Sequence, residues 1–193
     1  MDMELAVKGN TGSSFRMHPQ KFALWLFIVS VVMLFAALTS AYVVKQSSGV
    51  WLDFELPFMF DITTGIVILS SVFMHMAYLS GKRNEIKKLR IFLFLTVLTG
   101  LGFLTGQLIA WQELVAEGVF FVGNPAGSFV YVLSGVHGFH LVTGVIFLLI
   151  VAFSAFKYKV HSKSMVQMEM CATYWHFLGG LWLYLYLFLT LNH

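Results

Sequence analysis

Charged residues are scarce in this sequence of 193 residues: Asp, Glu, Lys and Arg make up only 11%, while 59% of the residues are hydrophobic and 17% aromatic. Ordinary soluble domains carry roughly 25% charged residues. The shortage of charge excludes an ordinary soluble domain, and a net charge of only +3 is no basis for a nucleic-acid-binding surface. The composition is typical of an integral membrane protein.

Cysteine is nearly absent as well. The single Cys171 can form no internal disulfide, and one thiolate cannot supply a cysteine-ligated metal cluster. The first 21 residues lack the apolar segment and cleavage site of a signal peptide, so we expect residues 1–20 to be a polar tail. No long linker follows, and residues 21–193 are expected to form a single domain.

Five hydrophobic segments are long enough to cross a bilayer as helices, because about 20 apolar residues span a hydrocarbon core of ~30 Å. They cover residues 22–44, 58–79, 91–112, 128–156 and 170–192. None alternates apolar and polar residues as the strands of a spanning β-barrel do. The predicted fold is therefore all-α, an integral membrane bundle of five transmembrane helices.

Lys and Arg lie almost entirely on one side of these spans, since 11 of the 12 are in the N-terminal tail and the second and fourth loops. The positive-inside rule places the N-terminus in the cytoplasm, or the equivalent compartment, and the C-terminus on the opposite side. An odd number of spans requires the same reversal.

Small residues recur inside the later spans at a spacing of four, as in Gly102 with Gly106 and Ser134 with Gly138. This spacing predicts that helix backbones approach closely there. The first span lacks glycine and is bulky on most faces, so we expect it at the rim of the bundle.

Ionisable residues at membrane depth are costly and usually face protein or water. Here they are few, and with the uncharged Gln107 they comprise Asp61, His75, His137, His140, Glu169 and His176. Asp61 and Glu169 lie near the ends of their spans, and Glu169 is expected to stabilise the start of the fifth helix through the helix dipole. His75 is expected to donate to a neighbouring backbone carbonyl.

The depths of His137, His140 and His176 in their spans allow these three side chains to converge in the inner half of the bilayer. On the residues alone, three interpretations of these histidines stay open. The first is structural, with neutral imidazoles hydrogen-bonding between helices. The second makes them axial haem ligands, as in b-type cytochromes, although no basic residue lies within a span to pair with haem propionates. The third is a proton or substrate path through a transporter.

Two motifs surround these histidines. The stretch GSFVYVLSGVHGFHLVTGVIFLL fits the pattern Phe-Tyr-x-x-(Ser/Thr)-Gly-x-His-Gly-x-His through Tyr131, Ser134, Gly135, His137, Gly138 and His140, with Gly144 following. The stretch EMCATYWHFLGGLW carries Glu169, Tyr174, Trp175, His176, Phe177 and Trp182. Both resemble the signature regions of subunit III of haem-copper cytochrome oxidases, and the first and third spans read like their counterparts through Lys21, Trp25, Gln107 and Trp111.

The resemblance extends over residues 21–191 and suits the short, five-helix form of subunit III, which lacks the first two of seven helices. It implies a chain without haem or copper that packs on the catalytic subunit I, beside subunit II and other subunits. Such a chain encloses phospholipid and supports proton uptake and durability during cytochrome c oxidation and oxygen reduction. No catalytic or metal-binding residue is then expected. The candidates for helix, lipid or subunit contacts are His137, His140, His176, Trp175, Tyr174, Glu169, Trp182, Gln107 and His75.

Two departures from the family pattern concern buried carboxylates. Val31 follows Ser30 where many members carry Glu, and Leu178-Gly179-Gly180 replaces a segment that usually contains Asp. Alternatives are the same subunit in a quinol oxidase or a nitric-oxide-reductase-type complex and, from another class, a b-type haem electron carrier. The bacterial cytoplasmic membrane is favoured over the mitochondrial inner membrane.

Overall fold

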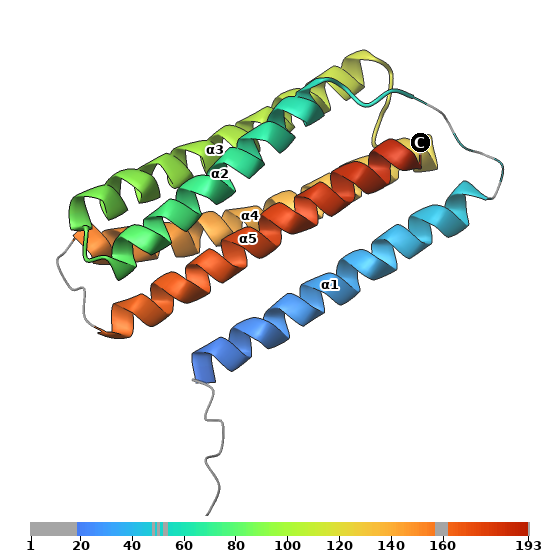
Figure 1. The fold of residues 1–193 in the computed structure, drawn as a ribbon. Coiled ribbons are helices and arrows are strands. Elements are labelled where there is room, and N and C mark those ends of the chain that lie inside the picture. Colours follow the sequence, from blue (N-terminus) through green and yellow to red (C-terminus); the bar gives the residue numbers. More distant parts are fainter. Residues whose placement is uncertain (1–18, 48, 50, 52–53, 157–161, 193) are drawn as a thin grey trace, which may run out of the picture.

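Five helices make up most of the computed structural model, which describes residues 19–47, 49, 51, 54–156 and 162–192. They are α1 (Pro19–Gln46), α2 (Met59–Lys82), α3 (Ile86–Ala116), α4 (Pro125–Phe156) and α5 (Ser162–Leu191). All five are long and apolar enough to cross a membrane, and the described ranges contain no strand. The predicted all-α bundle of five spans is confirmed (Figure 1), whereas the predicted tail lies outside the described residues except for its last two.

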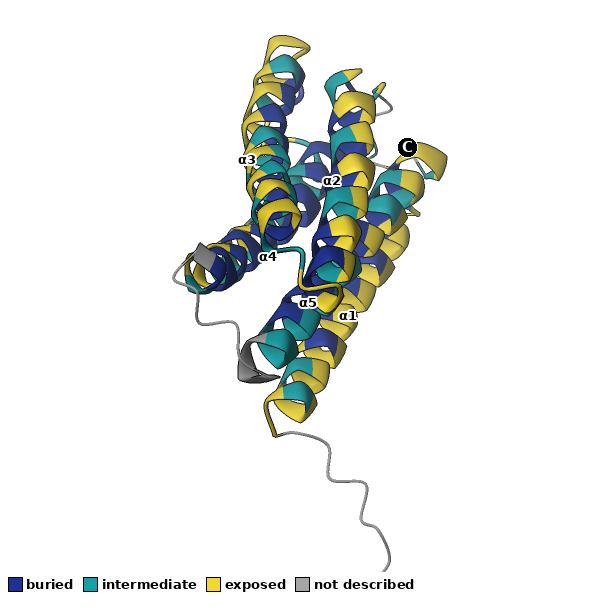
Figure 2. Cartoon of the chain, turned by 60° about the vertical axis from the view of Figure 1, so that its left-hand side comes forward, coloured by how far each residue is buried: buried dark blue, intermediate teal, exposed yellow. Residues whose placement is uncertain are grey.

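Helices α2 to α5 form a ring in which each helix packs on two others, and α1 lies outside this ring against α4 and α5 (Figure 1). The buried residues of α1 fall three or four positions apart, which places them on one face: Ile28, Val31, Phe35, Thr39 and Tyr42. The rest of α1 is largely exposed (Figure 2), so the prediction that the first span lies at the rim is confirmed.

The helices are longer than the apolar spans predicted. α3 begins at Ile86 instead of residue 91, and α5 begins at Ser162 instead of residue 170. Both helices continue through polar and basic residues, because a helix satisfies its own backbone hydrogen bonds beyond the hydrocarbon as well as within it. The prediction located the hydrophobic part of each helix rather than its ends.

A tight turn at residues 83–85 joins α2 to α3. Asn84 adopts a left-handed backbone conformation with φ of 56°, which Asn tolerates better than most residues. The Glu85 carboxylate accepts a hydrogen bond from Lys88 at 2.8 Å, and this bond lowers the pKa of Glu85. We call the end of the bundle with this turn and the start of α1 the basic end, and the opposite end, with the α3–α4 loop, the loop end.

Tryptophan side chains tie the ring of four helices together through hydroxyl groups. Each of three indole N–H groups donates to a hydroxyl on a neighbouring helix: Trp111 to Ser134 at 3.0 Å, Trp175 to Ser70 at 3.1 Å and Trp182 to Thr64 at 3.0 Å. The large apolar ring of each tryptophan is thereby buried together with its indole N–H, which has a hydrogen-bond acceptor. The pairs join α3 to α4 and α5 to α2.

Polar contacts hold α1 on α5 at both ends of the bundle and in between. They are Lys21 with Glu169 at 2.8 Å, Tyr184 with Thr39 at 3.2 Å, and Gln46 with the Asn192 carbonyl at 2.6 Å. These contacts therefore fix the rotation of α1 and its position along α5, although α1 covers little of the core.

Candidate functional site

His137 lies at the centre of the bundle and is fully buried. Aromatic rings from three other helices surround it. The centroids of Phe35 of α1, Phe103 of α3 and Trp182 of α5 lie 6.5, 5.8 and 5.1 Å from the imidazole centroid. The histidine of α4 is thus the point at which α1, α3, α4 and α5 meet.

Neither ring nitrogen of His137 has a hydrogen-bond partner among the described residues. The Oε1 atom of Gln107 is also buried without a partner there, although its Nε2 donates to Oγ1 of Thr63 at 3.0 Å. A buried polar atom left unpaired costs about 1–3 kcal/mol. The interpretation by an interhelical hydrogen bond thus finds no partner for His137 among the described residues, and its ring contributes to packing through shape.

His140 and Tyr174 lie where α4 and α5 meet α1. The Nδ1 atom of His140 lies 2.8 Å from the Val136 carbonyl of its own helix. The Tyr174 hydroxyl lies 2.9 Å from Oγ1 of Thr143 and donates to the His140 carbonyl at 3.3 Å. Phe27 of α1 packs on both rings, with centroids 6.2 Å from His140 and 5.7 Å from Tyr174. This group positions the N-terminal half of α1.

His176 belongs to a different surface, between α5 and α2. Its Nδ1 atom lies 2.5 Å from Oγ of Ser71, and its ring lies 6.0 Å from that of His75 between centroids. The expected interhelical hydrogen bond is confirmed here alone among the three histidines. His75 is exposed beside the His176 ring, and its hydrogen bond to a backbone carbonyl stays a prediction. The depths allowed all three histidines to converge, but His137 and His140 both contact Phe35, whereas His176 contacts His75 and Ser71.

Glycines of α3 and α4 provide the space that Trp175 occupies. A Cβ atom at Gly100 would lie 2.8 Å from Cη2 of the indole, and one at Gly144 would lie 3.6 Å from Cε3. Trp175 and Trp182 are both almost completely buried, and each fixes α5 to α2 through a hydrogen bond to a hydroxyl of α2. The sequence motif contains both tryptophans, but nothing in the sequence predicted the contact between Gly100 and Trp175.

The two carboxylates near the span ends have partners that the sequence did not indicate. Glu169 lies seven residues inside α5, so its expected role at the helix start is wrong, and its Oε2 accepts the hydrogen bond from Lys21 of α1. Asp61 does lie in the first turn of α2, and it accepts a hydrogen bond from the Tyr186 hydroxyl.

The bundle interior is apolar at the two positions where the family pattern has carboxylates. Val31 is buried on the face of α1 that packs on the ring. At Gly179 an added Cβ would lie 3.3 Å from Cγ1 of Val67, so α5 and α2 approach closely there. Within the described ranges, no three side chains of His, Cys, Asp or Glu are placed to hold a metal ion together. Cys171 is buried and free.

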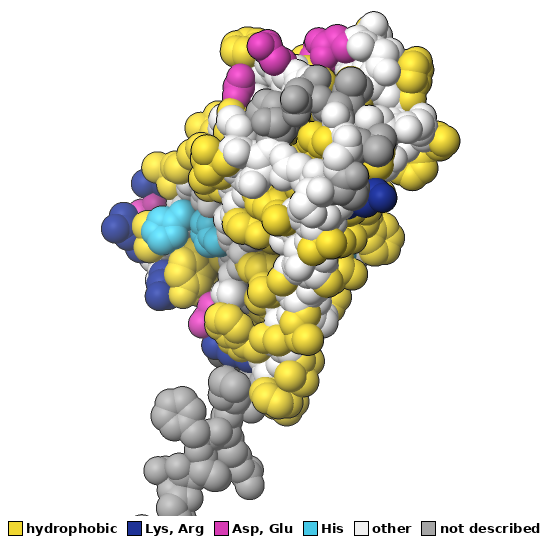
Figure 3. Space-filling view, turned by 90° about the vertical axis from the view of Figure 1, so that its right-hand side faces the viewer, with side chains coloured by type: hydrophobic (Ala, Val, Ile, Leu, Met, Phe, Trp, Pro, Cys, Tyr) yellow, Lys and Arg dark blue, Asp and Glu magenta, His cyan; other side chains and the backbone are white. Residues whose placement is uncertain are grey.

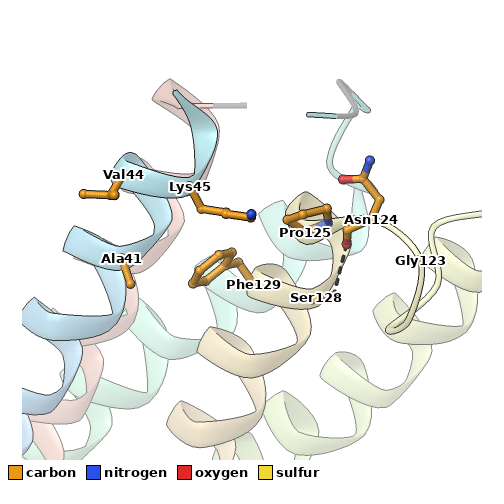
Figure 4. Close-up of a pocket in the computed structure, with 8 residues that line it drawn as sticks. All are labelled: Ala41, Val44, Lys45, Gly123, Asn124, Pro125, Ser128 and Phe129. Carbon is orange, nitrogen blue, oxygen red and sulfur yellow. Dashed lines mark hydrogen bonds between the residues drawn. The ribbon is translucent and has the colours of Figure 1, made fainter. Parts of the chain in front are cut away.

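A groove of about 750 Å³ opens at the loop end between α1 and the start of α4. Ala41 and Val44 of α1 and Phe129 of α4 form its apolar walls, and Lys45 extends toward Asn124 and the start of α4 (Figure 4). The Asn124 Oδ1 atom caps α4 by accepting from the Ala126 N–H at 2.9 Å. The groove thus combines apolar walls with polar groups at the loop end of the bundle.

Comparison with known proteins gives a consistent result. The sequence model of the family described as cytochrome c oxidase subunit III matches residues 1–192. Subunit 3 of the cytochrome bo(3) ubiquinol oxidase of Buchnera aphidicola (subspecies Schizaphis graminum) is 28% identical over 176 residues, 89% of this chain and 93% of the relative. Cytochrome c oxidase subunit 3 of Bacillus sp. strain PS3 is 28% identical over 167 residues, 84% of this chain and 80% of the relative. The carp (Cyprinus carpio) cytochrome c oxidase subunit 3 is 30% identical over 183 residues, 86% of this chain and 67% of the relative.

Proposed function

The chain belongs to the cytochrome c oxidase subunit III family, and on that premise we propose that it is the non-redox subunit of a haem-copper terminal oxidase that oxidises cytochrome c and reduces oxygen. In this proposal the chain packs on the catalytic subunit I, with subunit II and other subunits nearby. It holds phospholipid, supports proton uptake and prolongs activity during turnover. The observation that carries the proposal is the family match over nearly the whole chain.

The surroundings of the histidines favour packing over redox chemistry. The His137 ring is enclosed by aromatic side chains. His140 bonds to its own helix, and the nearest facing histidine pair, His75 with His176, lies on the separate α2–α5 surface. A b-type haem held between two helices needs histidines that face each other across space for the porphyrin. These contacts support a role in fixing the helices relative to one another.

The alternatives differ in what they predict for the purified chain. A quinol oxidase or a nitric-oxide-reductase-type complex would keep the same packing role and change only the electron donor or the substrate of the partner subunits. A b-type haem carrier would show a haem absorption band in the isolated chain. A transporter would give solute flux in liposomes that contain this chain alone. We expect neither the band nor the flux.

Replacing His137 by Phe separates the packing role from haem ligation. Phe keeps an aromatic ring in the cage and removes two buried nitrogens that have no partner among the described residues. We expect the unfolding free energy to stay within about 1 kcal/mol of wild type. The chain should remain in the purified complex with a normal haem spectrum. Loss of haem from a complex that still contains the His137→Phe chain would contradict the packing role.

The groove at the loop end supports the proposed binding of phospholipid. Its apolar walls suit acyl chains, and Lys45 lies in the last turn of α1, at the end of a helix long enough to cross a membrane. Lys near a membrane boundary attracts anionic headgroups by about 1 kcal/mol per charge. The groove also lies between α1 and the ring, so a lipid in it would fill the gap left by the sparse packing of α1.

A larger side chain in the groove should displace this lipid. We expect Ala41→Phe, which introduces a ring into the groove wall, to lower the phospholipid content of the purified complex. Ala36→Phe is the control, because Ala36 is exposed on another face of α1 and does not line the groove. Phospholipid per haem, measured by mass spectrometry, checks the prediction. Equal lipid content in both variants would remove the groove as the lipid site.

The proposed location is the bacterial cytoplasmic membrane, with the basic end of the bundle on the cytoplasmic side. Lys21 and Lys82 lie at that end together with the turn between α2 and α3. The support is the asymmetry of Lys and Arg along the sequence. Because Val31 and Gly179 replace the family's carboxylates, we propose that any support for proton uptake acts through neighbouring subunits rather than through a buried acid at these two positions.

A further inference from the structure

A second groove, of about 450 Å³, runs along the surface between α2 and α5. Val67, Ile68 and Leu183 form apolar walls, and Gly179 and Gly180 line the groove beside them. Gly179 is buried against Val67, whereas the exposed Gly180 leaves the backbone of α5 uncovered. A Cβ atom at Gly180 would meet no atom within 4 Å. Volumes of this size with mainly apolar walls are typical of small-molecule sites. The absence of a side chain at Gly180 leaves a flat surface on which a planar ring can lie.

Three polar side chains converge at one end of this groove. The Oγ atom of Ser71 lies 2.5 Å from Nδ1 of His176, and this contact orients the ring and leaves Nε2 available. The His75 ring, exposed and tilted by 55°, lies 6.0 Å from the His176 ring between centroids. Figure 3 shows histidine at the molecular surface, bordered by hydrophobic side chains.

The depth and charge of this end restrict the ligand. His75 precedes Lys82, the last residue of α2, by seven positions, so it lies ~10 Å further into the bilayer. None of the residues that line the groove is Asp, Glu, Lys or Arg. A phosphate headgroup would stay near the level of Lys82, whereas an uncharged ring with oxygen substituents is stable at the depth of His75. The ligand that fits is neutral and dissolved in the bilayer.

We propose that this groove binds a quinone or quinol, with the ring against Gly179 and Gly180 and one ring oxygen between His75 and His176. An imidazole can donate or accept a hydrogen bond, so the same pair suits a quinone carbonyl and a quinol hydroxyl. The hydrocarbon tail would follow Val67 and Leu183 toward the membrane centre. This site goes beyond the packing role, and it does not depend on which donor the assembled oxidase uses.

Photolabelling of the purified complex tests this site. The complex is placed in nanodiscs of synthetic phosphatidylcholine without quinone, and an azido derivative of decylubiquinone is the probe. We expect labelled peptides from residues 67–76 or 176–183, and unmodified decylubiquinone should compete with the label. His176→Phe, which removes the hydrogen bonds and keeps a ring, should weaken the apparent affinity by about tenfold.

A pair of glycine variants supplies the matched control. Gly180→Leu fills the groove at a position where the backbone tolerates a side chain, so it should lower the labelling about tenfold or more. Gly102→Leu, at another open position outside the groove, should leave the labelling unchanged. Equal labelling of both variants would overturn the proposal. So would competition by phosphatidylethanolamine as strong as that by decylubiquinone, because it would identify a general acyl-chain groove. Haem content and subunit composition of the same samples report on the proposed packing role separately.

Discussion

Trp182→Ala is expected to lower the unfolding free energy of the chain by about 3–5 kcal/mol, the loss typical of removing a large buried aromatic side chain. Trp182 is 1% exposed. Its indole stacks on Phe60 with centroids 6.0 Å apart, meets Phe103 edge to face at 4.9 Å and lies 5.1 Å from His137. The N–H also donates to Thr64, so the change leaves that hydroxyl without its donor.

Trp25→Ala is the matched control. Trp25 lies on α1 and is 52% exposed, so its removal leaves little cavity, and we expect a change within about 0.5 kcal/mol. Unfolding by increasing fractions of dodecyl sulfate in mixed micelles, followed by circular dichroism, compares the two variants. Equal losses of stability would show that the bundle interior does not depend on the cage around His137.

Gly106→Ala is expected to destabilise the chain by about 1–3 kcal/mol, as overpacking of a filled interior does. The new Cβ would lie 2.5 Å from Cγ2 of Thr63. Thr63 cannot turn away freely, because its hydroxyl donates to the Phe60 carbonyl at 3.0 Å and accepts from Gln107 at 3.0 Å. The backbones of α2 and α3 would have to separate, or that hydrogen-bonded contact would have to break.

Gly102→Ala, one turn earlier in α3, serves as the control for this prediction. No atom lies within 4 Å of a Cβ at Gly102. We expect this variant to be neutral or more stable by up to about 1 kcal/mol, since Ala favours helix over Gly. Denaturation in the same mixed micelles measures both variants. A Gly106→Ala chain as stable as the Gly102→Ala chain would contradict the close contact between α2 and α3.

The contrast between Gly102 and Gly106 shows which features of the fold could be predicted from the sequence and which could not. The spacing of four residues predicted a close helix contact at both Gly102 and Gly106, yet only Gly106 lies against another helix. In the pair Ser134 and Gly138, Ser134 accepts a hydrogen bond from Trp111 of α3. The number of spans followed from length and hydropathy. The order of the helices around the ring decides which face of each helix packs on which neighbour. This order could not be predicted, because lipid-facing and protein-facing residues of a membrane helix are both apolar.

The histidines show the same limit at the level of the site. The motifs drew attention to His137 and His176, but the partners of both residues come from distant parts of the chain. Phe35 and Phe103 enclose His137, and Ser71 lies 105 residues from His176 in sequence. Without the packing, a buried imidazole in an aromatic cage and a half-buried one in a surface groove could not be distinguished.

The ion pair between Lys21 and Glu169 was beyond prediction for a further reason. Both residues appeared to lie at span ends, where a charge finds water or a headgroup without a specific partner. Their meeting depends on α1 running alongside α5 with the right vertical offset, which the contacts of Tyr184 and Gln46 also set. A pair separated by 148 residues can be read only from the assembled bundle.

We propose that this chain supports a haem-copper oxidase by packing, without holding a redox centre itself. The most direct measurement compares the purified complex with a preparation from which this chain has been removed, recording the haem absorption spectrum and oxygen consumption over repeated turnovers. We expect equal haem per catalytic subunit and an equal initial rate, followed by a faster loss of activity without the chain. Loss of haem absorption in proportion to the chain removed would contradict it.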